Sequence, residues 1–404
     1  MKEILNQTYT TIAKLNGYRN YDLTLSRMIN RPEWLAQDYS ALPRVSWQKF
    51  PPRSVQESDI NLCRRLIASF EGATGNGSYN GASEIWRRIV EKEWVDLLNA
   101  ITENNLSRMA SLLNSMFQQP FMNGISSGSL AAKSTARAKR RIWRIRCLDE
   151  VISLAESLGC IRTHCPEQGD TAYGLRNGIE PVIEVIESKL NMNIGFPDIG
   201  AAYGFDLANR LLTPESLEHI YAATRAADAA NNLISNGSNL RVLEIGAGFG
   251  GTAYWFHQLR RFNLKNYTII DLPTTNVLQG YFLAKAFGAE NVRLYGEDDQ
   301  GQQFRVCPAS HFSETITSDF DILINQNSMP EMPDHIVFDY LNWAKSRLKG
   351  GIFFSYNQEA FAPYKSFLQT LVPEIVRQIP EYNLKFRHNS WLRRGYVEET
   401  YIII

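Results

Sequence analysis

The pattern of apolar positions divides the chain into a helical first half and an α/β second half. Residues 1 to about 58 are polar and aromatic with frequent prolines, which predicts short helices in an irregular arm. From about residue 59 to 190, apolar residues recur at helical spacing, as Leu66 and Phe70 do. From Leu240 onward, short apolar runs alternate with helical patterns, which is typical of a doubly wound sheet.

Helices are predicted where apolar residues recur at helical spacing, and two of them begin after a capping residue. Ser83 and Thr213 each stand at such a start, where a hydroxyl can accept a backbone hydrogen bond. Up to the first strand, the predicted helices span residues 59–73, 84–94, 106–117, 137–158, 180–190 and 214–231. Two features stay open. The segment 194–205 either lines a substrate pocket or links two domains. The helix predicted at 137–158 has a basic face formed by Arg137, Arg140, Arg141 and Arg144, which is either solvated or contacts a diphosphate of the substrate.

The second half predicts a sheet whose last two strands are antiparallel. Strands are expected at 240–245, 267–270, 292–295, 320–324, 352–356, 384–386 and 396–404, with helices from near 252 and at 275–287, 333–348 and 361–379. Only about nine residues join the last two strands, whereas a parallel crossover needs a dozen or more. One strand near the C-terminus is therefore expected to run against the others.

The strongest chemical signal is a strand, a glycine turn, a helix and a second strand between Leu240 and Asp271. Gly246, Gly248, Gly250 and Gly251 let the backbone approach a ligand without a Cβ, and the next helix start leaves free N–H groups. Asp271, at the end of the second strand, is placed to accept hydrogen bonds from ribose hydroxyls. This arrangement predicts a site for a nucleoside-bearing cofactor.

Glu244 helps to decide which cofactor this is, because the glycines also satisfy the dinucleotide spacing G-x-G-x-x-G. Glu244 lies inside the first strand, where a pyrophosphate would gain nothing from a negative charge. A cofactor with an amino-acid part and a sulfonium cation would use that charge. An ordinary strand-to-helix turn without a ligand is the simplest competing interpretation.

The stretch EIGAGFG (244–250) resembles motif I of class I S-adenosylmethionine-dependent methyltransferases. Together with YTIIDLP (267–273), FDILINQNSMPEM (320–332) and GGIFFSYNQE (350–359), it resembles the putative sugar O-methyltransferase family. The resemblance implies a Rossmann-like seven-stranded methyltransferase sheet with an antiparallel C-terminal strand. It also implies a methyltransferase domain at residues 201–404. The mainly helical region at 1–200 would recognise the substrate, cover the site as a lid, or form a dimer.

The resemblance further assigns a cofactor site for S-adenosylmethionine, whose product is S-adenosylhomocysteine. The methionine part would lie against Glu244, Gly246, Ala247, Gly248 and Gly250. Asp271 and Leu272 would hold the ribose side, Glu297 or Asp298 would approach the adenine, and Asn325 and Gln326 would flank the methyl donor.

Methyl transfer to a hydroxyl needs a group that removes a proton. We expect the candidate bases Glu331, His335 and His388 in loops after the later strands, with Glu359 in a further such loop. His335 has a suitable unperturbed pKa of about 6.5, but a surface position in the first turn of its helix is the simpler interpretation. We predict that the reaction requires no metal. The alternative is a magnesium ion bound by acids such as Asp298, Asp299, Glu331 and Glu359.

Composition narrows the partners and the compartment. The formal net charge is zero, so neither a nucleic acid nor a membrane surface is implied, and a small-molecule substrate is expected. No signal sequence or apolar run of about 20 residues is visible, and the five cysteines are scattered, which suits a reducing cytoplasm. The sequence leaves a homodimer open.

The function expected from the sequence is therefore methyl transfer to a hydroxyl of a sugar or a sugar-containing metabolite. One alternative is a methyltransferase that acts on a natural-product or modified-peptide scaffold. A second alternative is a partner protein that binds S-adenosylmethionine without catalysis. A dehydrogenase that uses NAD is a third, which Glu244 and the last pair of strands disfavour.

Overall fold

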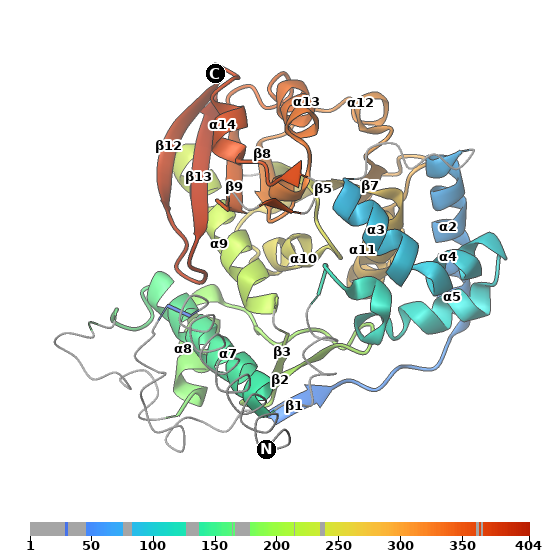
Figure 1. The fold of residues 1–404 in the computed structure, drawn as a ribbon, viewed down its shortest axis with the longest axis horizontal. Helices are drawn as coiled ribbons and strands as arrows, with labels where there is room; N and C mark the ends of the chain where they lie inside the picture. The colour runs from blue at the N-terminus through green and yellow to red at the C-terminus, as the bar shows by residue number, and fades with distance from the viewer. Residues whose placement is uncertain are drawn as a thin grey trace, which may run out of the picture.

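The computed structural model describes residues 29–30, 46–75, 83–126, 137–163, 165, 178–213, 215–234, 239–360, 363–364 and 367–404. For residues 137–142, 363–364 and 367–368 it describes the backbone alone. The arrangement of these parts is shown in Figure 1.

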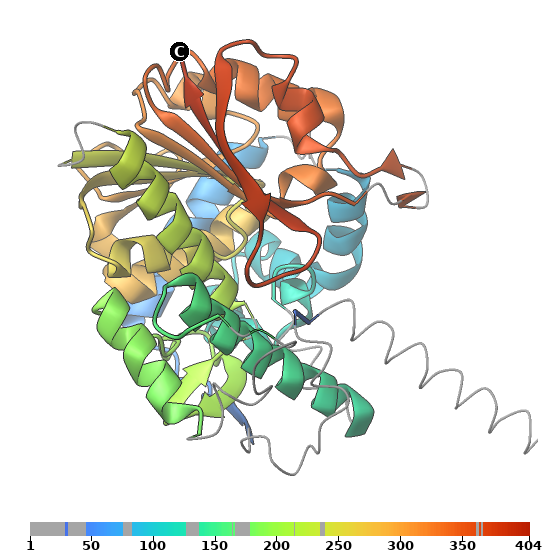
Figure 2. The same ribbon diagram turned by 90° about the vertical axis from the view of Figure 1, so that its left-hand side faces the viewer.

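An eight-stranded sheet forms the centre of the molecule, in the order β12-β13-β9-β8-β4-β5-β7-β6. Its strands are β4 (Asn239–Ile245), β5 (Asn263–Asp271), β6 (Val292–Arg293), β7 (Phe304–Pro308), β8 (Ile322–Gln326), β9 (Ile352–Gln358), β12 (Tyr382–Asn389) and β13 (Tyr396–Ile403). Strands β4 to β9 pair in parallel, whereas β13 pairs antiparallel with both β9 and β12. The C-terminal hairpin β12–β13 is the red pair of strands in Figures 1 and 2.

Helices cover both faces of the sheet because neighbouring residues of each central strand point to opposite sides. In β4, Val242 packs into one apolar cluster and Leu243 into another. The first cluster includes residues of α9 (Ser216–Leu233), α10 (Gly251–Gln258) and α11 (Pro273–Phe287). The second includes residues of α13 (Asp334–Ala344) and α14 (Val372–Val376). The sheet is therefore the middle layer of three.

The first half of the chain adds helices and a small sheet to one side of this core. Its helices are α2 (Glu57–Thr74), α3 (Glu84–Glu93), α4 (Val95–Thr102), α5 (Leu106–Leu113), α7 (Arg137–Ser157) and α8 (Glu180–Leu190), with the short 3-10 turns η2 (Met116–Gln118) and η3 (Pro120–Met122). Strand β1 (Ser46–Lys49) pairs antiparallel with β2 (Tyr203–Leu207), which pairs with β3 (Arg210–Leu212). None of the helices in the described residues is long and apolar enough to cross a membrane.

The two halves share one apolar cluster, which contains Leu62 of α2 and Leu148 of α7 together with Tyr281 of α11. The segment 194–205 joins them: Phe196 packs edge-on against Phe117, and Phe205 pairs across β2 and β3 with Leu212. No residue of this segment lines the cavity described below. It links the halves, and the division of the chain near residue 200 stays a prediction.

A buried carboxylate, Asp59, fastens α2 to α11. Its side chain is 2% exposed and accepts from Lys285 Nζ at 2.7 Å, Asn114 Nδ2 at 3.1 Å and the backbone N of Gln56 at 2.9 Å. Burial raises the pKa of Asp59, but these hydrogen bonds outweigh burial and hold the pKa below its usual value. The carboxylate is therefore charged and fully engaged at neutral pH.

The predicted fold class is confirmed. The sheet has the Rossmann-like order of class I methyltransferases, with one reversed strand, β13, and the short edge strand β6 as an eighth member. Helices α7 and α8 agree closely with the spans predicted from helical spacing. Thr213 Oγ1 accepts from Ser216 N at 3.1 Å, as expected of a residue at a helix start.

The sequence pattern missed one strand, and one predicted helix is wrong. The strand next to β5 is β7, which the sequence pattern missed, while the predicted strand at 292–295 is the short edge strand β6 beyond it. The predicted helix at 361–379 is replaced in the described residues by a two-residue ladder of β10 (Pro363–Tyr364) and β11 (Phe367–Leu368), followed by the short α14. Pro363 and Pro373 explain the second error, since proline lacks the N–H that a helix interior requires.

We predict that Asp59→Ala destabilises the protein by about 3 kcal/mol, because it leaves the partly buried Lys285 and the buried Asn114 without this acceptor. Asp96→Ala is the matched control: Asp96 pairs with Arg108 but its side chain is 68% exposed, so the loss should be about 1 kcal/mol or less. Thermal and denaturant unfolding measure both. Equal losses would show that Asp59 does not fasten the two helices.

Candidate functional site

A cavity of about 450 Å³ lies at the carboxyl ends of the parallel strands. One side, here called the strand-end wall, is formed by residues that end or follow strands, namely Glu244–Gly248, Ile270–Leu272, Ala309 and Gln326–Ser328, together with Thr252, Thr275, Ile336 and Tyr340. The opposite side, the helical wall, contains Ser83, Trp86, Gly124–Ser126, Trp143, Arg146, Glu215, Glu218, His219, Arg393 and Tyr396. The site is therefore built between the sheet and the first half of the chain.

The glycine turn after β4 has a backbone that only glycine fits. Gly246 has φ +72° and Gly248 has φ +59°, in the left-handed region. A Cβ on Gly246 would lie 2.1 Å from Ser328 Oγ, so the turn is closed by the loop after β8. Gly250, with φ +94°, caps α10 and does not line the cavity. Gly246, Ala247 and Gly248 do line it, as the sequence predicts.

Glu244 is buried within β4, with 1% of the residue exposed. Tyr267 Oη donates a hydrogen bond to its Oε2 at 2.8 Å. Burial raises the pKa of Glu244 to about 8, which outweighs the opposing effect of this hydrogen bond. A buried carboxyl with this pKa is a favourable neighbour for a cation, because a positive charge restores its ionised form.

Asp271 lies at the end of β5 and faces the same cavity. It accepts from Leu272 N at 2.8 Å and from Gln279 Nε2 at 2.7 Å, and burial raises its pKa to about 6. Ala309, whose backbone N donates to the carbonyl of Asp271 at 2.7 Å, and Tyr340 line the cavity on this side. An acid beside a small residue and an aromatic ring suits a ribose joined to a flat base.

Asn325 and Gln326 both lie in β8 but have different surroundings. Asn325 is fully buried, donates to the carbonyl of Ile245 at 2.8 Å and accepts from Asn357 Nδ2 at 2.8 Å, so it ties three strands together. It does not line the cavity. Gln326 does, and its Oε1 accepts from Thr252 Oγ1 at 2.7 Å.

Glu297 and Asp298 do not line the cavity. Glu297 pairs with Arg65 at 2.7 Å and accepts from Leu294 N at 2.8 Å. Both acids follow β6. Strand β7 lies between β6 and β5, so these acids are one strand too far from Asp271, which ends β5. Ala309, immediately after β7, occupies the position that was predicted for them.

Glu331 joins the two walls. It ends the 3-10 turn η6 (Met329–Glu331) after β8, and its Oε2 accepts from the indole Nε1 of Trp86 at 2.9 Å. Burial raises the pKa of Glu331 to about 7, although the hydrogen bond from Trp86 opposes this. Of the three predicted bases, this is the one that lines the cavity.

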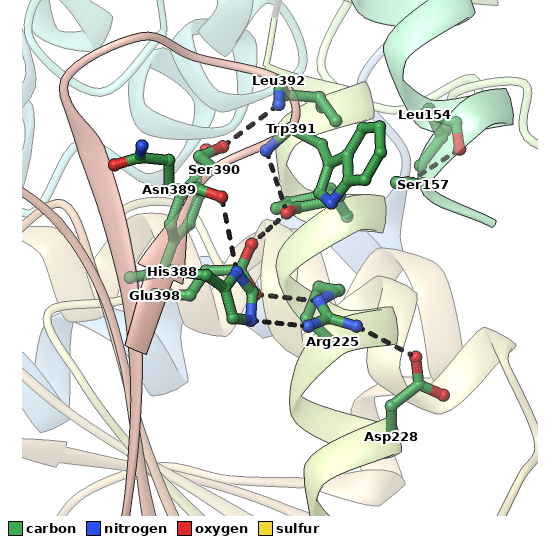
Figure 3. Close-up of polar contacts among 12 residues, drawn as sticks. Leu154, Ser157, Arg225, Asp228, His388, Asn389, Ser390, Trp391, Leu392 and Glu398 are labelled. Carbon is green, nitrogen blue, oxygen red and sulfur yellow. Dashed lines mark hydrogen bonds and ion pairs between the residues drawn. The ribbon is translucent and has the colours of Figure 1, made fainter. Parts of the chain in front are cut away.

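The two predicted histidines lie elsewhere. His335 is exposed in the first turn of α13. His388, in β12, faces Arg225 and Glu398, and its Nε2 lies 2.9 Å from Arg225 Nη2 (Figure 3). Neither lines the cavity. In the described residues, no group of three or more His, Cys, Asp or Glu side chains is arranged to hold a metal ion.

The sequence did not identify the polar residues of the helical wall. Glu218 and His219 come from α9, Arg146 from α7 and Arg393 from the loop between β12 and β13, which reaches toward the N-terminal helices (Figure 2). Burial lowers the pKa of His219 to about 4, so the imidazole is neutral. These residues are far apart in the chain, and no local motif connects them.

No family model matches the sequence, and none of the curated proteins compared with it matches. Among solved structures, the chain is similar to the magnesium protoporphyrin IX methyltransferase ChlM from Synechocystis PCC 6803 with bound SAM, with a TM-score of 0.33 and 11% identity over 47% of this chain and 81% of that chain. The glycopeptide N-methyltransferase MtfA complexed with sinefungin follows at 0.33 and 14%, over 45% and 94%. The [4+2]-cyclase SpnF gives 0.32 and 15%, over 44% and 80%. Similarities this low carry no argument about function.

We predict that Gly246→Ala destabilises the protein by more than the roughly 1–2 kcal/mol that a left-handed φ costs, because its Cβ also meets Ser328. Gly296→Ala is the matched control, since Gly296 has φ +86° with no atom within 4 Å of an added Cβ. In a Ser328→Gly background, the cost of Gly246→Ala should fall to that of the control. Thermal unfolding of the four variants measures this, and an unchanged cost in that background would contradict it.

Proposed function

We propose that this protein is an S-adenosylmethionine-dependent methyltransferase that acts on a small-molecule acceptor. One observation carries the proposal: a buried acid, a left-handed glycine turn and a second acid line the same cavity as Glu331. The sheet order is the one that class I methyltransferases use, and the site lies at the carboxyl ends of its strands, where such sheets bind ligands.

The strand-end wall has the chemistry that this cofactor requires. Asp271 would accept from the ribose hydroxyls, with Ala309 and Tyr340 beside the base. Glu244 would lie near the amino-acid part, where it would offset positive charge. When bound, S-adenosylmethionine supplies a methyl group activated by a sulfonium cation. NAD would instead bring a pyrophosphate next to Glu244, a pairing of like charges.

Glu331 is our candidate for the general base. An oxygen nucleophile must lose its proton as the new bond to carbon forms, and a base is effective when its pKa lies near the operating pH. Burial brings the pKa of Glu331 to about 7, and Trp86 fixes the carboxylate by a hydrogen bond of 2.9 Å. The acceptor proton would pass to the other oxygen, Oε1.

The acceptor that we propose is a hydroxyl of a sugar or a sugar-containing metabolite. Two indole rings, Trp86 and Trp143, and the carboxylates of Glu218 and Glu331 line the cavity, and such groups stack on and hydrogen-bond to polyhydroxylated rings. A natural-product or peptide scaffold is the competing acceptor. Since the helical wall comes largely from the first 200 residues, we propose that this region recognises the acceptor.

The first test is calorimetric titration with S-adenosylmethionine, S-adenosylhomocysteine and NAD in parallel. We expect both sulfur nucleosides to bind and NAD not to bind. Because the pKa of Glu244 is raised to about 8, binding of a cationic group should release a proton at pH 7, and affinity should rise with pH up to about 8. Titration in buffers of different ionisation enthalpy measures the release. Binding of NAD alone would overturn the proposal.

Two variants test Glu331 once an acceptor is found. Glu331→Gln keeps an acceptor for Trp86 but removes the base, so kcat should fall about 100-fold or more while cofactor affinity is retained. Trp86→Phe removes a hydrogen bond that lowers the pKa of Glu331, so the rising limb of the pH–rate profile should move to higher pH.

Trp94→Phe is the matched control for Trp86→Phe, because Trp94 is buried, lies outside the cavity lining and has no partner for its Nε1 among the described residues. Its pH–rate profile should match that of the unaltered protein. Full activity of Glu331→Gln would exclude Glu331 as the base. Cofactor binding without turnover of any acceptor would favour the non-catalytic alternative.

A further inference from the structure

Two arginines share the helical wall of the cavity. Arg146 projects from α7, and its side chain is 12% exposed. Arg393 comes from the loop between β12 and β13, and its side chain is 27% exposed. Each charge influences the pKa of the other residue's neighbours, and that of Glu218 responds to both. Arg393 also has a lowering effect on the pKa of Arg146 itself, so two guanidinium groups from distant parts of the chain lie near each other at this wall.

Each arginine is held in place by one carboxylate and one aromatic ring. Arg146 Nε donates to Glu150 at 2.7 Å, and the guanidinium lies 5.4 Å from the ring of Trp143. Arg393 Nη1 donates to Glu218 at 2.6 Å, and its guanidinium lies 3.9 Å from the ring of Tyr396. These contacts fix the orientation of both planar groups.

Most of the N–H donors remain unused. Each guanidinium has five N–H groups, and within the described residues the side chain of Arg146 donates only through Nε and that of Arg393 only through Nη1. Both side chains line the cavity and are partly exposed, so their remaining N–H groups are accessible to a ligand there. Planar donors fixed in this way match the two oxygens of a carboxylate or the oxygens of a phosphate.

The partner carboxylates do not fully neutralise the two arginines. Burial raises the pKa of Glu150 to about 7, so it carries only part of its charge at neutral pH. The pKa of Glu218 is lowered, because Arg393 and Arg146 outweigh the opposing effect of burial. The charge of Arg146 is therefore only partly offset by Glu150, and a largely buried cation favours an anion beside it.

We propose that Arg146 and Arg393 bind an oxyanion, a carboxylate or a phosphate, that is part of the methyl acceptor. This inference rests on the proposed function, and it narrows the acceptor to an anionic molecule. Tyr396 connects this oxyanion site to the candidate base, since its ring lies against Arg393 and its hydroxyl responds to the charge of Glu331. An acceptor anchored by its anion would present another part to Glu331.

The competing explanation is that these ion pairs are purely structural, one within α7 and one between α9 and the β12–β13 loop. That role would make the variants less stable without changing the affinity for anions. Anion affinity and thermal stability must therefore be measured on the same proteins. Arg225 offers a matched control: it is an ion-paired guanidinium on α9, bound to Glu398 at 2.8 Å, and it lies outside the cavity lining (Figure 3).

The experiment titrates the complex with S-adenosylhomocysteine by calorimetry at constant ionic strength. The probes are inorganic phosphate, benzoate and the neutral isostere benzamide. We expect at least one anion to bind at least tenfold more tightly than benzamide. Arg146→Gln should weaken that anion at least tenfold while changing the affinity for S-adenosylhomocysteine less than twofold, and Arg225→Gln should change neither. If Arg146→Gln does not fold, Arg146→Lys, which keeps the charge but loses the planar fork, should give a smaller loss.

Each outcome decides a separate point. Tighter binding of phosphate than of benzoate assigns the anion to a phosphorylated acceptor, and the reverse order assigns it to a carboxylate. Anion affinities that are unchanged in Arg146→Gln and Arg146→Lys, or no anion binding to a complex that holds S-adenosylhomocysteine, would overturn the oxyanion site alone. Failure to bind S-adenosylhomocysteine would overturn the proposed function, and with it the acceptor role of the two arginines.

Discussion

The site depends on a small group of buried hydrogen bonds that fasten the carboxyl ends of three adjacent strands. The carbonyl of Ile245, at the end of β4, accepts from Asn325 Nδ2 at 2.8 Å and from Ser328 Oγ at 3.0 Å, and Asn325 accepts in turn from Asn357 of β9. Ser328 then occupies the space where a Cβ of Gly246 would lie. Ser328, which bonds to the end of β4, thus requires glycine at position 246. Without a side chain, the backbone of Gly246 is open to the cavity. An unpaired amide at Asn325 would be costly at this depth, so the arrangement is strongly specified.

The sequence predicts this edge well because its elements are local. Alternation and glycine spacing identify β4, the turn, α10 and β5, and thereby place Glu244 and Asp271 in one cavity. The adenine-side prediction was wrong for a non-local reason. Two short apolar runs, which form β6 and β7, follow α11. Neither run has a sequence feature that indicates which of them pairs with β5. Strand order depends on pairing between distant segments, which periodicity does not encode.

The helical wall was beyond sequence reasoning for the same reason. Trp86, Arg146 and Arg393 come from α3, α7 and the β12–β13 loop, and each looks like an ordinary surface or core residue in its own segment. His335 shows the converse error, since a suitable unperturbed pKa and a position after a strand suggest a base, yet the first turn of α13 leaves it exposed. Only the fold distinguishes a titratable side chain that lines a cavity from one that is exposed to solvent.

Burial and pairing divide the acids around the cavity into two kinds. Glu218 is buried but paired with Arg393, so its pKa is lowered and it remains a fixed charge that holds its neighbours. Glu244 is buried and Glu331 is partly buried, and neither has a cationic partner in the described residues, so loss of solvent raises their pKa values to about 8 and about 7. A group that titrates near neutral pH responds to what enters the cavity: a cation restores the charge of Glu244, and an acceptor proton can be taken up by Glu331. Among Glu218, Glu244 and Glu331, the carboxylate paired with an arginine is thus the fixed charge, and the two without such a partner are the ones available for chemistry.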